Sequence, residues 1–211
     1  MESTPNVGAP TTRRRLSWDD RHAQLLDAFR DLVRTHDMDD VTLARVAAHA
    51  GVTKPVAYDH FGDRSGLLAE AYRAFEAHQR DALLQALAQA PPDLAAVSAL
   101  VAGAYIGCCI AEGVELAAVV SALSGSATLS VLRAEAELAY LEICREALEP
   151  FTGPLDPAPL SAIPGAGDAL ARNAMSGSMS TARACETLAV VIQAVALASA
   201  VPSARPGGRA T

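Results

Sequence analysis

The spacing of hydrophobic residues predicts helices along most of the chain. Leu25, Phe29 and Leu32 recur at three- and four-residue intervals, which predicts a helix over residues 18–36. The same periodicity, punctuated by Gly and Pro, predicts the other helices. Their expected ranges are 43–50, 54–61, 64–89, 94–112, 114–123, 127–149, 168–175 and 181–200. Residues 150–167 hold five prolines and three glycines, so we expect this segment to be mostly loop.

The composition favours the same fold class. Hydrophobic residues make up 51% of the 211 positions and aromatic residues only 4%, so the apolar content is mainly Ala, Leu and Val. This composition is typical of closely packed helices, and we expect an all-α protein. The longest apolar stretches, 97–111 and 188–201, are shorter than the roughly 20 residues of a membrane span. Without an apolar signal-peptide region, we expect a cytoplasmic protein and no membrane partner.

Two short predicted helices near the N-terminus have the organisation of a helix-turn-helix. Residues 43–50 and 54–61 are joined at Gly51, and a longer predicted helix lies on each side. Thr42 and Thr53 are each preceded by a valine, as in an N-cap with a hydrophobic staple. The second short helix is then free to enter the major groove of DNA.

The exposed side chains of this segment suit contact with DNA. Lys54 can meet a phosphate, Tyr58 and His60 can donate hydrogen bonds to phosphate oxygens, and Val56 can pack on a thymine methyl. Threonine hydroxyls and free amides at helix N-termini are natural phosphate sites. The candidate DNA-binding residues are Thr42, Arg45, Thr53, Lys54, Pro55, Val56, Tyr58, Asp59, His60 and Arg64.

Residues 18–72 resemble the N-terminal DNA-binding domain of the TetR family of transcriptional regulators. The resemblance covers about a quarter of the chain and includes the run LLDAFRDLVRTHDMDDVTLARVAAHAGVTKPVAYDHFGDRSGLLAEAY. It implies a homodimer that binds a pseudo-palindromic operator in double-stranded DNA, usually as a repressor, and releases it when a small molecule binds the C-terminal domain. By position, Arg64 matches a phosphate-contacting lysine. The family's other DNA-contacting sites match Thr42, Thr53, Lys54, Tyr58 and His60.

Two positions depart from the family pattern. Ala44 stands where a basic residue is common, with Arg45 one step along the helix. Asp59 stands where a neutral or basic residue is frequent, and its carboxylate could accept from a cytosine amino group or repel phosphates.

Taken alone, the net charge argues against a nucleic-acid partner, but its distribution weakens that objection and places any DNA-binding surface near the N-terminus. The net charge is −7, but residues 1–64 carry 9 Lys and Arg against 10 Asp and Glu. The remaining residues, 65–211, carry 8 against 14, so most of the acidity lies there.

The four cysteines, Cys108, Cys109, Cys144 and Cys185, have no metal-finger spacing, and the simplest interpretation is that they are buried apolar residues. A thiol-based redox sensor is the alternative to a ligand-responsive regulator. The chain has no G-x-S-x-G, P-loop, H-E-x-x-H or dinucleotide motif. We therefore expect a protein that is not an enzyme and that binds no cofactor or metal.

The larger C-terminal part is expected to bind the effector and to form the dimer. The predicted domains are a disordered arm (1–16), the helix-turn-helix domain (17–66), the ligand-binding and dimerisation domain (67–201) and a disordered tail (202–211). Polar residues on otherwise apolar helices are candidates for the ligand pocket: His78, Tyr105, Cys109, Glu112, Tyr140 and Cys144. The last helix is apolar on two sides, which indicates a second subunit. The candidate interface residues are Leu188, Val191, Ile192 and Val195.

Overall fold

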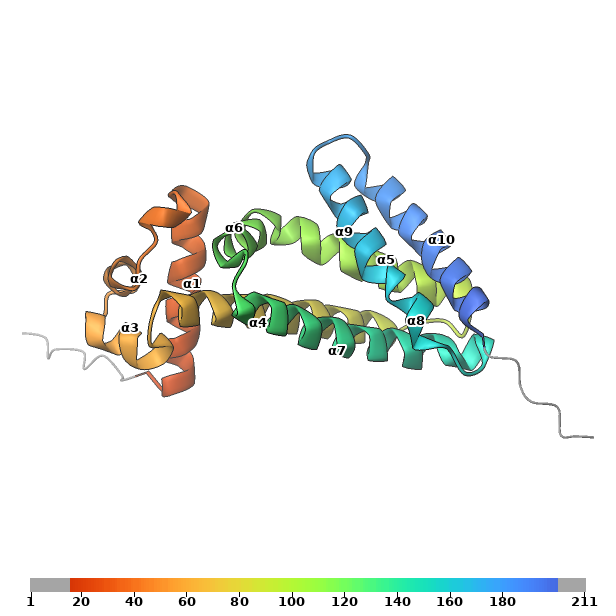
Figure 1. Cartoon of the computed structure of the whole chain (residues 1–211), viewed down its shortest axis with the longest axis horizontal. Coiled ribbons are helices and arrows are strands. Elements are labelled where there is room, and N and C mark those ends of the chain that lie inside the picture. The colour runs from red at the N-terminus through yellow and green to blue at the C-terminus, as the bar shows by residue number, and fades with distance from the viewer. Residues whose placement is uncertain (1–15, 201–211) are drawn as a thin grey trace, which may run out of the picture.

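The computed structural model describes residues 16–200, and these fold into α-helices (Figure 1). The expected all-α class is confirmed, since this part of the chain contains no strand. Apart from Leu16, the predicted arm and tail lie outside the described residues. The elements are α1 (Trp18–Thr35), the short 3-10 helix η1 (Met38–Asp40), α2 (Leu43–His49), α3 (Lys54–Phe61), α4 (Arg64–Leu87), α5 (Leu94–Ala111), α6 (Gly113–Leu123), α7 (Ala127–Thr152), α8 (Pro157–Leu160), α9 (Ala162–Met175) and α10 (Thr181–Ser199).

Local signals at the helix ends set the N-terminal architecture. The Ser17 hydroxyl accepts from the amide of Asp20 at 3.0 Å and caps α1. Gly51 and Gly62 have φ angles of +67° and +72°, in the left-handed region that favours glycine. The two glycines therefore separate α2 from α3 and α3 from α4.

The C-terminal part is a bundle around α5. The long helices α4 and α7 run side by side along the molecule, while α9 and α10 form a hairpin against α5 (Figure 1). By length and composition, α5 and α10 are apolar enough to cross a membrane. However, α5 packs against α4, α9 and α10, as the core helix of a globular domain also does.

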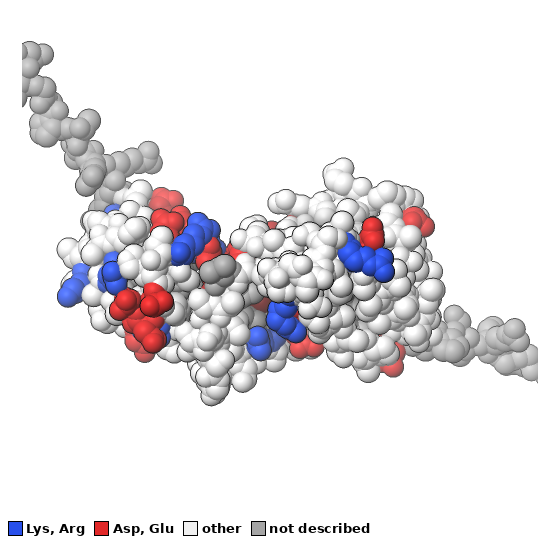
Figure 2. All heavy atoms as spheres, turned by 90° about the horizontal axis from the view of Figure 1, so that it is seen from above, with Lys and Arg blue, Asp and Glu red and all other residues white. Residues whose placement is uncertain are grey.

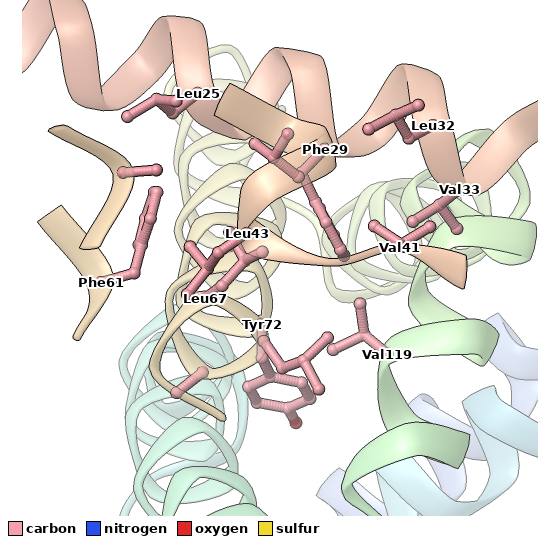
Figure 3. Packing of buried hydrophobic residues seen from close by; sticks show 14 of the residues in the cluster. Leu25, Phe29, Leu32, Val33, Val41, Leu43, Phe61, Leu67, Tyr72 and Val119 are labelled. Carbon is pink, nitrogen blue, oxygen red and sulfur yellow. The ribbon is translucent and has the colours of Figure 1, made fainter. Parts of the chain in front are cut away.

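The hydrophobic core of the DNA-binding helices continues into the C-terminal part. Phe29 and Val41 pack in one buried cluster with Leu67 of α4 and Val119 of α6 (Figure 3). Tyr72 lies at the edge of this cluster, with its hydroxyl pointing away from it (Figure 3). The predicted boundary between residues 66 and 67 therefore lies inside a helix that belongs to both parts.

The expectation of a loop over residues 150–167 is wrong. Helix α7 continues to Thr152 with Pro150 near its end, α8 follows, and α9 begins at Ala162 rather than at Asp168. Pro164 is the third residue of α9, where the backbone amide has no partner within the helix. Pro157, Pro159 and Pro164 thus occupy the first turns of α8 and α9, where a helix tolerates proline, whereas Pro150 lies within the last turn of α7.

Candidate DNA-binding surface and effector cavity

Helix α3 is held by one face and exposes the other. Ala57 is fully buried and Phe61 nearly so, and both belong to the N-terminal core. Lys54, Tyr58 and Asp59 are exposed, with 49% of Tyr58 accessible. Seen from above, acidic and basic side chains are mixed at the end of the molecule that carries α1–α3 (Figure 2). An exposed α3 can enter a groove of DNA. Because the charges around it are mixed in sign, the side chains of α3 itself would have to supply the attraction to DNA.

The two predicted N-cap threonines differ in what their hydroxyls do. The Thr42 hydroxyl accepts from the amide of Arg45 at 3.2 Å, so the cap of α2 forms as expected. The Thr53 side chain makes no cap hydrogen bond to the described residues of α3. Both threonines and Arg45 are exposed. The free hydroxyl of Thr53 and the open N-terminus of α3 remain available to a phosphate.

His60 is packed against aromatic neighbours. Its ring stacks on Trp18, with ring centroids 3.8 Å apart and an interplanar angle of 29°. Burial lowers the pKa of His60, and the nearby charges of His22 and Arg21 lower it further. The imidazole is therefore mainly neutral at pH 7. Trp18 is itself 60% exposed beside α3, so it is a surface residue of the site that the sequence interpretation did not include.

Two polar side chains fasten the helices to one another. Arg64 donates to the carbonyl oxygen of Met38 at 2.8 Å and to that of Val41 at 3.3 Å. Gln24 donates to the carbonyl oxygen of Ala50 at 3.0 Å, which satisfies the end of α2. Arg64 was expected at a phosphate, and the structure places it in the joint between η1 and α4. Gln24 was missed because nothing in the sequence signals a partner 26 residues away.

A cavity of about 330 Å³ lies between α4, α5, α6, α7 and α9. Of the predicted ligand-binding residues, Tyr105, Cys109 and Tyr140 line it. The hydroxyl of Tyr105 donates to Oδ1 of Asp168 at 2.7 Å, and the rings of Tyr105 and Tyr140 meet edge to face at 5.4 Å. The lining also contains polar residues that the sequence interpretation missed. These are Glu76, Gln79, Arg133, Glu137 and Asp168.

The structure does not bring the other three predicted ligand-binding residues to this cavity. The imidazole of His78 and the carboxylate of Glu112 are hydrogen-bond partners, and the His78 side chain is 59% exposed. Cys144 is fully buried in the C-terminal core. Helical spacing put Glu112 on the face of Tyr105 and Cys144 on the face of Tyr140, but neither side chain lines the cavity.

All four thiols have pKa values above the usual range. Burial is the main cause for each, and it raises the pKa of Cys109 and of Cys144 to about 12. Cys108 and Cys185 also lie near the carboxylates of Glu112 and Glu186. Because the thiolate is the reactive form, these sites disfavour rapid oxidation.

The last helix presents a different apolar face from the one expected. Leu188 and Ile192 are fully buried in the core of the chain itself, so neither is free to meet a second subunit. Val190 and Leu197 are 64% and 63% exposed on the opposite side of α10. The predicted interface therefore moves to that exposed side, where Ala194 lies between them.

At one end of the molecule, α3 is supported by its neighbouring helices and exposes one face. A helical bundle with a cavity lies at the other end. This is the organisation of a helix-turn-helix protein. Residues 25–71 match the family model described as "Bacterial regulatory proteins, tetR family". The regulator BetI of Klebsiella pneumoniae (strain 342) is 33% identical over 103 residues, 48% of this chain and 49% of BetI. BetI of Escherichia coli (strain K12 / DH10B) is 33% identical over 87 residues, 41% and 40% of the two chains. The chain thus spans about half the length of the curated relatives it matches.

Solved structures share the fold over a larger part of the chain. A transcriptional regulator of Pseudomonas aeruginosa PAO1 superposes with a TM-score of 0.73 at 16% identity, covering 86% of this chain and 93% of the other. A TetR-family regulator of Streptomyces coelicolor gives 0.69 at 20% identity, covering 85% and 82%. Residues 25–71 are therefore similar to the N-terminal domain of the TetR family, and the fold of the described residues is that of solved TetR-family regulators.

Proposed function

We propose that the protein is a cytoplasmic transcriptional regulator that binds a pseudo-palindromic operator as a homodimer and represses from it. A small molecule in the cavity between α4, α5, α6, α7 and α9 would release the DNA. The observation that carries this proposal is the supported but exposed α3, with Lys54, Tyr58 and Asp59 open to a major groove. The role is regulatory and not catalytic, and it requires no cofactor or metal.

The exposed residues divide into two kinds of contact. Lys54 and the α3 N-terminus with its Thr53 hydroxyl serve phosphates, which fix the register of the protein on DNA. Tyr58, Val56 and Asp59 would reach base edges, where Asp59 would accept from a cytosine amino group.

Arg45, Thr42 and Pro55 border the same surface. Trp18 of α1 covers His60 and extends the exposed surface. His60 therefore supports this surface by packing more than by donating to a phosphate.

Two connections link the cavity to the DNA-binding helices. Tyr72 belongs to the N-terminal core and also lines the cavity. Glu115 of α6 pairs with Arg34 of α1, and the Glu115 carboxylate is almost fully buried. A ligand that shifts α4 or α6 would therefore move α1, to the extent that it prefers the shifted conformation.

The dimer would form through the exposed apolar side of α10. Val190, Ala194 and Leu197 follow at helical spacing, and an isologous contact buries the same residues on both subunits. A second subunit then also fixes the separation of the two α3 helices, which must be about 34 Å on straight DNA.

The proposal is tested by selecting binding sites from a random DNA pool and measuring affinity by fluorescence anisotropy over a range of salt concentrations. We expect a two-fold symmetric site. Lys54→Ala should weaken binding to all sequences and lower the salt slope by about one. Arg80→Ala, in an exposed part of α4, is the matched control and should change neither. Recovery of no enriched sequence, or equal effects of the two substitutions, contradicts the proposal.

The redox alternative is less well supported. A sensor cysteine needs a low pKa and access to solvent, and the raised pKa values of the four thiols oppose this. Cys185 is the least buried of the four cysteines. If dilute peroxide releases the DNA from the parent protein but not from a Cys185→Ser variant, the redox alternative is supported.

A further inference from the structure

The effector cavity contains more negative than positive charge. Three carboxylates line it, those of Glu76, Glu137 and Asp168, against the single guanidinium of Arg133. With all four ionised, the sum is three negative charges and one positive, or −2. None of the four takes part in the ion pairs found among residues 16–200. Asp168 accepts a hydrogen bond from Tyr105, and Glu137 and Asp168 are exposed, but none of the three carboxylates has a cationic partner within ion-pair distance among these residues.

Glu76 is the carboxylate whose charge is least solvated. Its pKa is raised, mainly by burial and further by the charge of Asp168. The Tyr72 hydroxyl and the charge of Arg133 offset only part of that effect. A cation placed beside Glu76 would recover the solvation that the carboxylate loses on folding.

A second, independent feature of the lining is the buried hydroxyl of Tyr140, which has no nitrogen or oxygen partner among the described residues. Its oxygen is shielded from solvent. The thiol of Cys144, a weak hydrogen-bonding group, lies beside it. An unsatisfied buried hydroxyl costs free energy, which a donor on a bound molecule would remove.

The aromatic rings complete the site. Tyr105 and Tyr140 meet edge to face at an interplanar angle of 71° and form a corner of the cavity lining. Tyr105 uses its own hydrogen to donate to Asp168, which fixes that carboxylate at the same corner. Aromatic faces attract cations and also cover the apolar part of a ligand.

We propose that the cavity binds a protonated organic amine, with the N–H groups donating to Glu76, Asp168 and the Tyr140 hydroxyl oxygen. The apolar body of the amine packs against Tyr105 and Tyr140. A cavity of about 330 Å³ is at the small end of ligand pockets, so the amine is a small molecule. The inference rests on the proposed function only in treating this ligand as the effector. Arg133 does not change the sign, because a bound anion would face three carboxylates.

The charge preference is tested with four probes that share one carbon framework. They are 4-phenylbutylamine, (4-phenylbutyl)trimethylammonium, 4-phenylbutan-1-ol and 4-phenylbutanoate. By calorimetry at pH 7, the protonated amine should bind about tenfold more tightly than the alcohol, because its hydrogen bonds are charge-assisted. The quaternary ion should bind between these two, since it has the charge but no N–H donor. The carboxylate should bind most weakly.

Substitutions assign the preference to particular residues. Glu76→Gln and Asp168→Asn should each lower amine affinity by about tenfold and leave alcohol affinity unchanged. Glu146→Gln is the matched control, an exposed carboxylate on α7 outside the cavity lining. Tyr140→Phe should weaken the amine more than the quaternary ion. Circular dichroism of each variant confirms that it remains folded.

Three results would overturn the inference. They are tighter binding of the alcohol or the carboxylate than of the amine, no binding of the amine, or an amine affinity in Glu76→Gln and Asp168→Asn equal to that in the control Glu146→Gln. These measurements need no DNA, so they are separate from the proposed function. If the amine binds through Glu76 but leaves operator affinity unchanged, the ligand class stands and the effector role fails. If a neutral or anionic compound releases the operator from this cavity, the effector role stands and the amine is excluded.

Discussion

Gly167 of α9 allows Tyr105 to reach its place in the cavity wall. A methyl group added at Gly167 would lie 2.5 Å, 2.7 Å and 3.0 Å from three atoms of the Tyr105 ring. The ring cannot retreat easily, because Tyr105 is 7% exposed and its hydroxyl donates to Asp168 and lies 3.3 Å from the carbonyl oxygen of Pro164. Gly167→Ala therefore forces the wall of the cavity apart.

The magnitude follows from two opposing contributions. Overpacking a buried site costs about 1–3 kcal/mol. Replacing a helical glycine by alanine returns about 1 kcal/mol. Gly167→Ala should therefore lower the free energy of unfolding by about 0–2 kcal/mol. Gly165→Ala, in the same helix, places its methyl group with nothing within 4 Å and should raise stability by about 1 kcal/mol.

The difference between the two variants, about 1–3 kcal/mol, isolates the clash. It corresponds to a separation in melting temperature of roughly 2–12 °C for a chain of this size. Urea or thermal unfolding followed by circular dichroism measures it. In a Tyr105→Ala background the difference should vanish, because the ring is gone. If Gly167→Ala is as stable as Gly165→Ala in the unmodified chain, the packing at this wall is not as described.

Three further predictions concern charges and the apolar face of α10. Glu115→Gln should lower the free energy of unfolding by about 1 kcal/mol, measured by urea titration, since its partner Arg34 is more than half exposed and partly screened. Burial raises the pKa of Glu76, beside Tyr72, Arg133 and Asp168, so its contribution to stability is present at low pH and is lost as pH rises through the folded pKa. Thermal melts should therefore show Glu76→Gln to be more stable than the parent at pH 7, with the gap closing toward and below pH 4.5. Leu197→Asp should convert the proposed dimer to monomer in sedimentation, whereas Leu138→Asp, at an exposed leucine on α7, should not.

The N-terminal half of the molecule could be predicted from sequence because its signals are local. A cap, a staple and a glycine stop each act within about five residues, so Thr42, Gly51 and Gly62 can be recognised without knowing the fold. What these signals do not reveal is which exposed residue another helix covers. His60 lies under Trp18, 42 residues earlier in the chain, and Arg64 reaches back to Met38.

The cavity was harder to predict because its residues come from five helices. Glu76 and Asp168 are 92 residues apart, and Asp168 directly follows a segment whose prolines predicted a loop. Periodicity identified Tyr105 and Tyr140 as facing inward, but it could not separate cavity from core, so Cys144 was included with them. For α10 it found two apolar sides without indicating which one the chain itself buries.

The way in which α4 joins the two ends bears on how a ligand could act. Glu76 and Arg64 stand on this one helix of 24 residues, which contains no proline. Its only glycine, Gly66, lies in the first turn, where a methyl group would be 2.0 Å from the carbonyl oxygen of Phe61, so α3 and α4 meet there backbone to backbone. A helix without an internal break moves as one unit, so a displacement of Glu76 also displaces the first turn of α4, where α4 meets α3. Glu76, the carboxylate proposed to bind the amine, thus lies on the same helix that sets the position of α3.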